Sequence, residues 1–122
     1  MRLARWIFRV AGVYGLLSVG PLYFLESRIG RDQPPPITHP EYFYVFIGVT
    51  LAWQILFLLI STDPVRYRPA MPVAVLEKAA FAVAAPLLFA MQRVGVQTLA
   101  FSMIDGLLGV LFVMAYLRTP TR

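Results

Sequence analysis

The chain has 122 residues, of which 59% are hydrophobic and only 14% are charged. An ordinary soluble domain carries about 25% charged residues, so these are too few to cover a water-facing surface. The chain holds no cysteine and one histidine, which excludes disulfides, thiolate nucleophiles, iron–sulfur sites and histidine clusters. The composition therefore predicts one membrane domain over residues 1–122, with no room for a separate soluble domain.

The net charge of +5 would suggest nucleic acid if the chain were soluble. No basic stripe with interleaved aromatic residues lies outside the apolar segments, so we expect no nucleic-acid partner. The positive-inside rule, which places basic residues in cytoplasmic loops, explains the excess of arginine more simply.

The first apolar segment covers about residues 6–25, after the basic opening MRLAR. It has the layout of a secretory signal, with a positive start followed by an apolar stretch. Arg9 interrupts the apolar core, however, and Pro21 directly follows the candidate cleavage site SVG. We therefore expect a retained first helix.

Three further segments have the roughly 20 apolar residues that a membrane-spanning helix needs. Together with the first they predict helices over residues 6–25, 42–61, 70–92 and 95–117, an outer loop over 26–41 and an inner loop over 62–69. Pro86 lies well inside the third helix and should kink it or remove a backbone hydrogen bond. Residues 93–95 alone separate the last two helices, which predicts a tight antiparallel hairpin.

The outer loop contains three consecutive prolines, residues 34–36, and these predict an extended, polyproline-like spacer. The expected fold is thus all-α, an integral membrane antiparallel four-helix bundle.

The distribution of arginine sets the expected orientation. With the N-terminus inside, the opposite side collects few basic residues, and acids balance them there. The cytoplasmic side then holds Arg2, Arg5, Arg9, Arg66, Arg68, Arg118 and Arg122, and the other side Arg28, Arg31 and Arg93. We expect both termini to be cytoplasmic and the protein to lie in the inner (plasma) membrane of a bacterium.

Polar residues from three helices fall in one layer of the cytoplasmic half of the bilayer. Glu77 and Lys78 lie roughly 10–12 Å from the cytoplasmic end of the third helix, and Gln54 lies about as deep in the second. Arg9 enters the same layer from the first helix. A charged residue at a helix centre costs about 2.5–3.5 kcal/mol on insertion scales, so each of these groups needs a partner.

Neighbouring residues on a helix point about 100° apart, so Glu77 and Lys78 should satisfy each other poorly. The best expected partner for Glu77 is Arg9, with Arg5 next and Gln54 as a hydrogen-bond donor. Lys78 should extend its stem toward the headgroups. Three interpretations stay open: an ion pair that orders the helices, a proton or substrate site, and a site where a partner protein supplies the counter-charge.

Asp105 lies near the bilayer midplane in the fourth helix. Helical spacing places it on a polar and small face with Thr98, Ser102, Gly109 and Tyr116. The second helix has a comparable stripe of Thr50, Gln54, Phe57 and Ser61. Desolvation favours a neutral carboxyl, so Asp105 should be either a functional group or the neutral partner in a hydrogen bond between helices.

Small residues predict close helix approach without any ligand. They recur at Gly12 and Gly15 in the first helix and at Ala80, Ala82, Ala84 and Ala85 in the third.

The inner loop STDPVRYRP carries the most informative motif outside the helices. Asp63 before Pro64 can cap a short turn. Arg66 and Arg68 flank Tyr67 at headgroup level, where they either determine the topology or bind an anionic lipid headgroup or a phosphate.

The length and the four spans resemble the small multidrug-resistance transporters, which carry an essential glutamate in their first helix. Here the first helix carries Arg9 and no acid, so that function does not carry over.

No hydroxyl has a histidine in the same layer, and no metal set or phosphate loop is present. We therefore expect neither an enzyme nor a metal or other cofactor. One interpretation is a structural or interaction module that works in the lipid bilayer as a homo-oligomer or with a partner membrane protein. The alternative is a carrier of protons, lipids or a small solute that uses Glu77 and Asp105.

Overall fold

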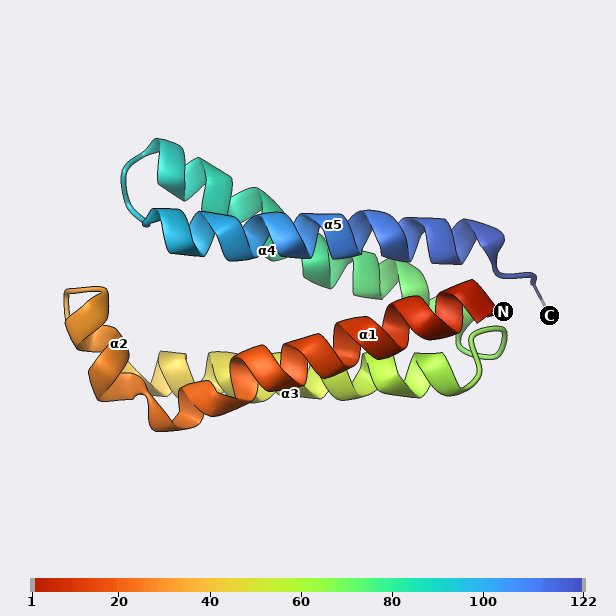
Figure 1. Cartoon of the computed structure of the whole chain (residues 1–122), viewed down its shortest axis with the longest axis horizontal. Helices are drawn as coiled ribbons and strands as arrows, with labels where there is room; N and C mark the ends of the chain where they lie inside the picture. The colour runs from red at the N-terminus through yellow and green to blue at the C-terminus, as the bar shows by residue number, and fades with distance from the viewer. Residues whose placement is uncertain (1, 122) are drawn as a thin grey trace. The chain divides into compact units, whose positions relative to one another are not determined.

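The computed structural model describes residues 2–121 and is all-helical over that range, with no strand. The α-helices are α1 (Arg2–Val19), α2 (Glu26–Asp32), α3 (Pro40–Thr62), α4 (Met71–Ala90) and α5 (Val96–Arg118). Two short 3-10 helices, Gly20–Phe24 and Arg68–Ala70, precede α2 and α4 (Figure 1).

Four of these helical stretches are long and apolar enough to cross a membrane: Arg2–Phe24, Pro40–Thr62, Arg68–Ala90 and Val96–Arg118. They confirm the four predicted segments, with boundaries that differ by a few residues. Large apolar side chains also stay exposed along them, including Leu17 at 72% and Leu117 at 71%. A helix that is apolar on its outer face as well suits a lipid environment.

The described residues form two compact units. The α1–α3 unit comprises residues 9–59, and the α4–α5 unit comprises residues 2–8 together with residues 60–121.

In the α1–α3 unit, α1 and α3 lie side by side and antiparallel (Figure 1). A Cβ atom on Gly12 would lie 2.8 Å from the Leu58 side chain and 2.9 Å from the Gln54 carbonyl oxygen, and one on Gly15 would overlap the Gln54 side chain. The predicted role of both glycines in close helix packing is therefore confirmed.

The predicted extended spacer in the outer loop is only partly correct. Residues 26–32 form the short helix α2, and the non-helical segment begins at Gln33. Glu26 lies in the first turn of α2 and Arg31 in its last, which favours helix by charge–dipole interaction. Glu26 also accepts a hydrogen bond of 2.9 Å from the Tyr44 hydroxyl, which ties the start of α2 to α3.

The α4–α5 unit contains the predicted antiparallel hairpin (Figure 1). The buried residues of α4 are Met71, Ala74, Lys78 and Ala85, and those of α5 include Ser102, Gly109, Phe112 and Ala115. Ser102 and Gly109 belong to the predicted polar and small face of the fourth helix, so this face points inward. Ala80 and Ala84 are exposed, so that pair does not pack within this unit, and the small residues that do pack lie on the neighbouring face.

The connection between α4 and α5 is a C-terminal capping motif. The N–H of Arg93 donates to the Leu88 carbonyl at 2.8 Å, and the N–H of Gln92 donates to the Phe89 carbonyl at 2.9 Å. This is the paired bonding of a Schellman motif, in which a left-handed residue follows the helix. Gln92 takes that position with φ 60°, although glycine is the usual residue there. Upstream, α4 continues unbroken through Pro86.

A dense core closes the other end of the hairpin. The Phe8 ring stacks on the Phe112 ring with centroids 4.3 Å apart, and both side chains are fully buried. Ala4, Ile60, Met71 and Ala115 are buried in the same unit. The start of α1, the connection into α4 and the end of α5 therefore meet at one end of this unit.

Candidate functional site

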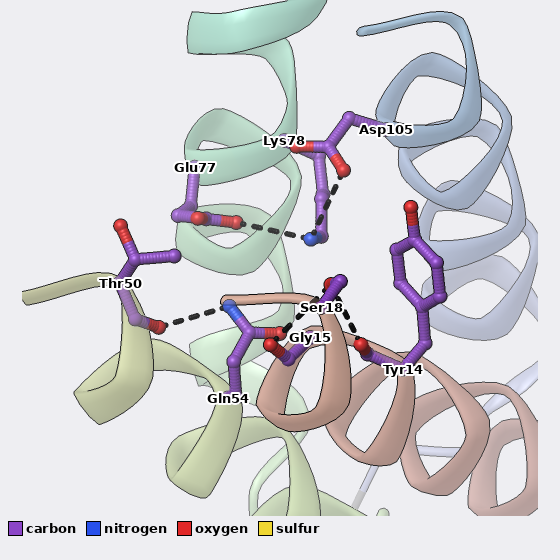
Figure 2. Close-up of polar contacts among 8 residues, drawn as sticks. All are labelled: Tyr14, Gly15, Ser18, Thr50, Gln54, Glu77, Lys78 and Asp105. Carbon is purple, nitrogen blue, oxygen red and sulfur yellow. Dashed lines mark hydrogen bonds and ion pairs between the residues drawn. The ribbon is translucent and has the colours of Figure 1, made fainter. Parts of the chain in front are cut away.

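The polar triad Glu77, Lys78 and Asp105 is the main candidate site. Figure 2 shows the Lys78 ammonium between two carboxylates, with Nζ 3.7 Å from Glu77 Oε2 and 3.6 Å from Asp105 Oδ1. The Lys78 side chain is 3% exposed, and the two acids are 16% and 17% exposed. One buried cation therefore joins an acid of its own helix to an acid of the next helix.

A glycine on α5 lets Lys78 lie against that helix. A Cβ atom on Gly109 would lie only 3.3 Å from Lys78 Cβ, and one on Gly106 would lie 3.6 Å from Ala82 Cβ. Because Gly109 follows Asp105 by one helical turn, the stem of Lys78 passes close to the α5 backbone beside its ionic partner. Gly109, a member of the predicted polar and small face, thus lets Lys78 approach Asp105.

One expectation about Lys78 is wrong, because its side chain is buried rather than extended to the headgroups. The expectation that Lys78 satisfies Glu77 poorly is confirmed, since Nζ lies 3.7 Å from Glu77 Oε2 and that oxygen has no hydrogen-bond partner. The flexible four-carbon stem lets the ammonium contact α5 instead of reaching the headgroups. Asp105 has this cation beside it, while its expected role, as a functional group or as the neutral member of a hydrogen bond between helices, stays a prediction.

The triad is not internally balanced, since it holds two acids and one base. Glu77 Oε2 is buried and accepts no hydrogen bond, because Lys78 Nζ lies beyond hydrogen-bond distance from it. A buried carboxylate oxygen without a donor is costly. The excess acid can be neutralised by a proton or by a cation from outside the triad.

Gln54 and Arg9 belong to the α1–α3 unit. The Gln54 amide nitrogen donates to the Thr50 carbonyl at 2.9 Å (Figure 2), while its Oε1 is buried without a hydrogen-bond partner. Gln54, Phe57 and Ser61 are buried and Thr50 is half-buried, so the predicted stripe does face inward. Arg9 is exposed, and its pairing with Glu77 stays a prediction.

Arg66 and Arg68 lie together at the end of the α4–α5 unit. Arg68 Nε donates to the Thr119 carbonyl at 2.8 Å, and its Cζ lies 3.9 Å from the centroid of the Tyr116 ring. The Asp63 carboxylate accepts the Arg66 backbone N–H at 3.3 Å, which confirms the predicted turn cap. The Thr119 anchor was not predictable, because a carbonyl acceptor 51 residues away leaves no pattern in the sequence.

His39 and Glu41 form an exposed pair, with Nδ1 3.0 Å from Oε1. Over residues 2–121, no three histidine or acidic side chains gather in an arrangement that could hold a metal ion.

Comparisons with protein-family models, with curated proteins and with solved structures find no match to this chain. No relative therefore suggests a role for the polar triad or for the arginine pair.

Proposed function

We propose that this small membrane protein acts as a structural or interaction module. The observation that carries the proposal is the buried Lys78 ammonium, 3.6 Å from Asp105 on the adjacent helix. An ion pair between two apolar helices is hard to open without solvent. It therefore supports a hairpin held in one register, so that its outer faces are available to lipid and to another membrane protein.

In the complete proposal the helices assemble as an antiparallel four-helix bundle in an inner membrane, with both termini cytoplasmic. The occupant of the outer faces is a second copy of the chain or a partner membrane protein. The arginine distribution supports the orientation. The exposed apolar side chains on α4 and α5, such as Leu76, Leu107 and Val110, support contact with lipid or protein.

The second candidate is a carrier driven by proton binding. It is favoured by the unbalanced charge of the triad and by the buried Glu77 Oε2 without a hydrogen bond. A carboxylate that gains and loses a proton while Lys78 alternates between two acids would provide a switch for transport. The two candidates predict different results when Glu77 or Asp105 is replaced by its neutral amide.

Glu77→Gln and Asp105→Asn separate the two candidates. If the triad is structural, Asp105→Asn should lower the free energy of unfolding by about 1–2 kcal/mol, and Glu77→Gln by less than about 1 kcal/mol. The reason is that the Asp105 pair joins two helices, whereas the Glu77 pair lies within one helix. Thermal unfolding of each purified variant in detergent shows which variant loses more stability.

Proton flux into proteoliposomes, reported by a pH-sensitive dye, completes the comparison. The structural candidate predicts the same flux for wild type, both variants and empty liposomes. Wild-type flux that is lost in a fully folded Glu77→Gln variant would reject it in favour of the carrier.

The proposed orientation has its own test, because the chain contains no native cysteine. Ser27 and Thr121 are exposed and lie in the expected outer loop and after α5. In spheroplasts, Ser27→Cys should react with a membrane-impermeant maleimide, and Thr121→Cys should react only after permeabilisation. The reverse pattern would show that the termini face outward.

A further inference from the structure

A cavity of about 240 Å³ lies at the end of the α4–α5 unit, lined by Val65, Arg66, Arg68, Pro69 and Thr121. Since a water molecule occupies about 30 Å³ of liquid, the cavity has room for several waters or for one tetrahedral anion. Its lining residues include two arginines and a threonine, which carry hydrogen-bonding side chains, and two apolar residues, Val65 and Pro69.

The positive charge of this cavity has no carboxylate partner in the described chain. Neither Arg66 nor Arg68 forms an ion pair with an acid over residues 2–121. The nearest acid in sequence, Asp63, accepts the backbone N–H of Arg66. An anion bound here would therefore face two uncompensated cations.

Arg68 is held in place before any ligand arrives. Its Nε bonds to the Thr119 carbonyl, and its guanidinium lies over the Tyr116 ring. Its two terminal nitrogens make no hydrogen bond within the described residues, so the planar fork that suits phosphate oxygens remains available. A side chain that is already ordered loses little entropy on binding.

The cavity also lies where the apolar spans end. The span Pro40–Thr62 ends just before it, Arg68–Ala90 begins in it, and Val96–Arg118 ends three residues before Thr121. In a membrane this level is occupied by lipid headgroups, whose phosphates attract cytoplasmic arginine and lysine.

We propose that this cavity binds a phosphate group through Arg66, Arg68 and Thr121. The site does not depend on the proposed function, because no member of the polar triad takes part. A phosphodiester of an anionic lipid and free phosphate present the same oxygens, so the experiment must separate these two sources.

The test uses the purified full chain and two probes, short-chain phosphatidylglycerol and inorganic phosphate. Binding is followed by the shift in melting temperature as each probe is titrated in a zwitterionic detergent. Arg66→Gln is the main variant, since Arg66 is exposed and its side chain makes no hydrogen bond or ion pair within residues 2–121, its Cζ lying 5.5 Å from the centroid of the Tyr67 ring. Its apparent affinity should fall about tenfold, because one charge-assisted hydrogen bond is lost.

Arg93→Gln is the matched control, because it removes the same charge from the connection at the other end of α4. It should bind as tightly as wild type. Arg68→Lys keeps the charge but loses the fork and the Nε bond to Thr119, and it should weaken binding as well.

Binding of phosphatidylglycerol alone identifies a lipid site that needs the apolar chains as well as the phosphate. Binding of both probes in competition identifies a site for the phosphate group itself, and binding of inorganic phosphate alone identifies a site for the free anion. The proposal is overturned if neither probe binds wild type more tightly than Arg66→Gln, or if Arg93→Gln loses as much affinity.

Discussion

Replacing Lys78 by methionine is expected to lower the free energy of unfolding by about 3 kcal/mol, because removing one member of a buried ion pair leaves the others uncompensated. Methionine keeps most of the apolar stem, so the packing against Gly109 changes little. The two carboxylates, Glu77 and Asp105, would lose the cation that lies beside both of them. Thermal or denaturant unfolding in detergent measures the loss.

The triple variant Glu77→Gln, Lys78→Met and Asp105→Asn tests the cause. A neutral set of similar shape should recover most of the lost stability, since it removes the unpaired charges together with the pair. Arg28→Met is the control, because its pair with Asp32 is exposed, at 69% and 64%, and should contribute almost nothing. If Lys78→Met unfolds like wild type, the triad does not hold the hairpin.

Gly12→Ala is expected to lower the free energy of unfolding by about 2 kcal/mol, the cost of overpacking a close helix contact. The added Cβ would meet Leu58 at 2.8 Å and the Gln54 carbonyl oxygen at 2.9 Å. The Leu58 side chain can rotate away, but the backbone oxygen can move only if α3 moves. Melting curves in detergent would show a lower midpoint for the variant.

Gly20→Ala is the matched control for this substitution, because nothing lies within 4 Å of the position where its Cβ would be added. This variant should have the same melting midpoint as wild type. The melting midpoint of Gly15→Ala should lie between those of Gly12→Ala and Gly20→Ala. The clash there is with the Gln54 side chain, which can turn aside if it gives up its hydrogen bond to the Thr50 carbonyl. Equal midpoints for Gly12→Ala and Gly20→Ala would contradict the close approach of α1 to α3.

Several features followed from the sequence because they depend on neighbours along the chain. Hydropathy over a span is such a property, and the four long helices lie close to their predicted ranges. The inward face of α5 was also predictable, since Ser102, Asp105 and Gly109 repeat with the helical period. The helix α2 was missed because the three prolines beyond it outweighed the short segment of Glu26 to Asp32.

The tertiary structure alone decided which groups meet. A long, flexible side chain such as Lys78 can reach either the headgroups or a neighbouring helix, and the close approach at Gly109 is what brings it beside Asp105. Arg68 likewise finds its acceptor at Thr119, 51 residues away. The sequence by itself determined which residues are polar within the apolar spans and on which helical face they lie, because periodicity is local. Their partners depend on the distance and rotation between helices, which no local pattern encodes.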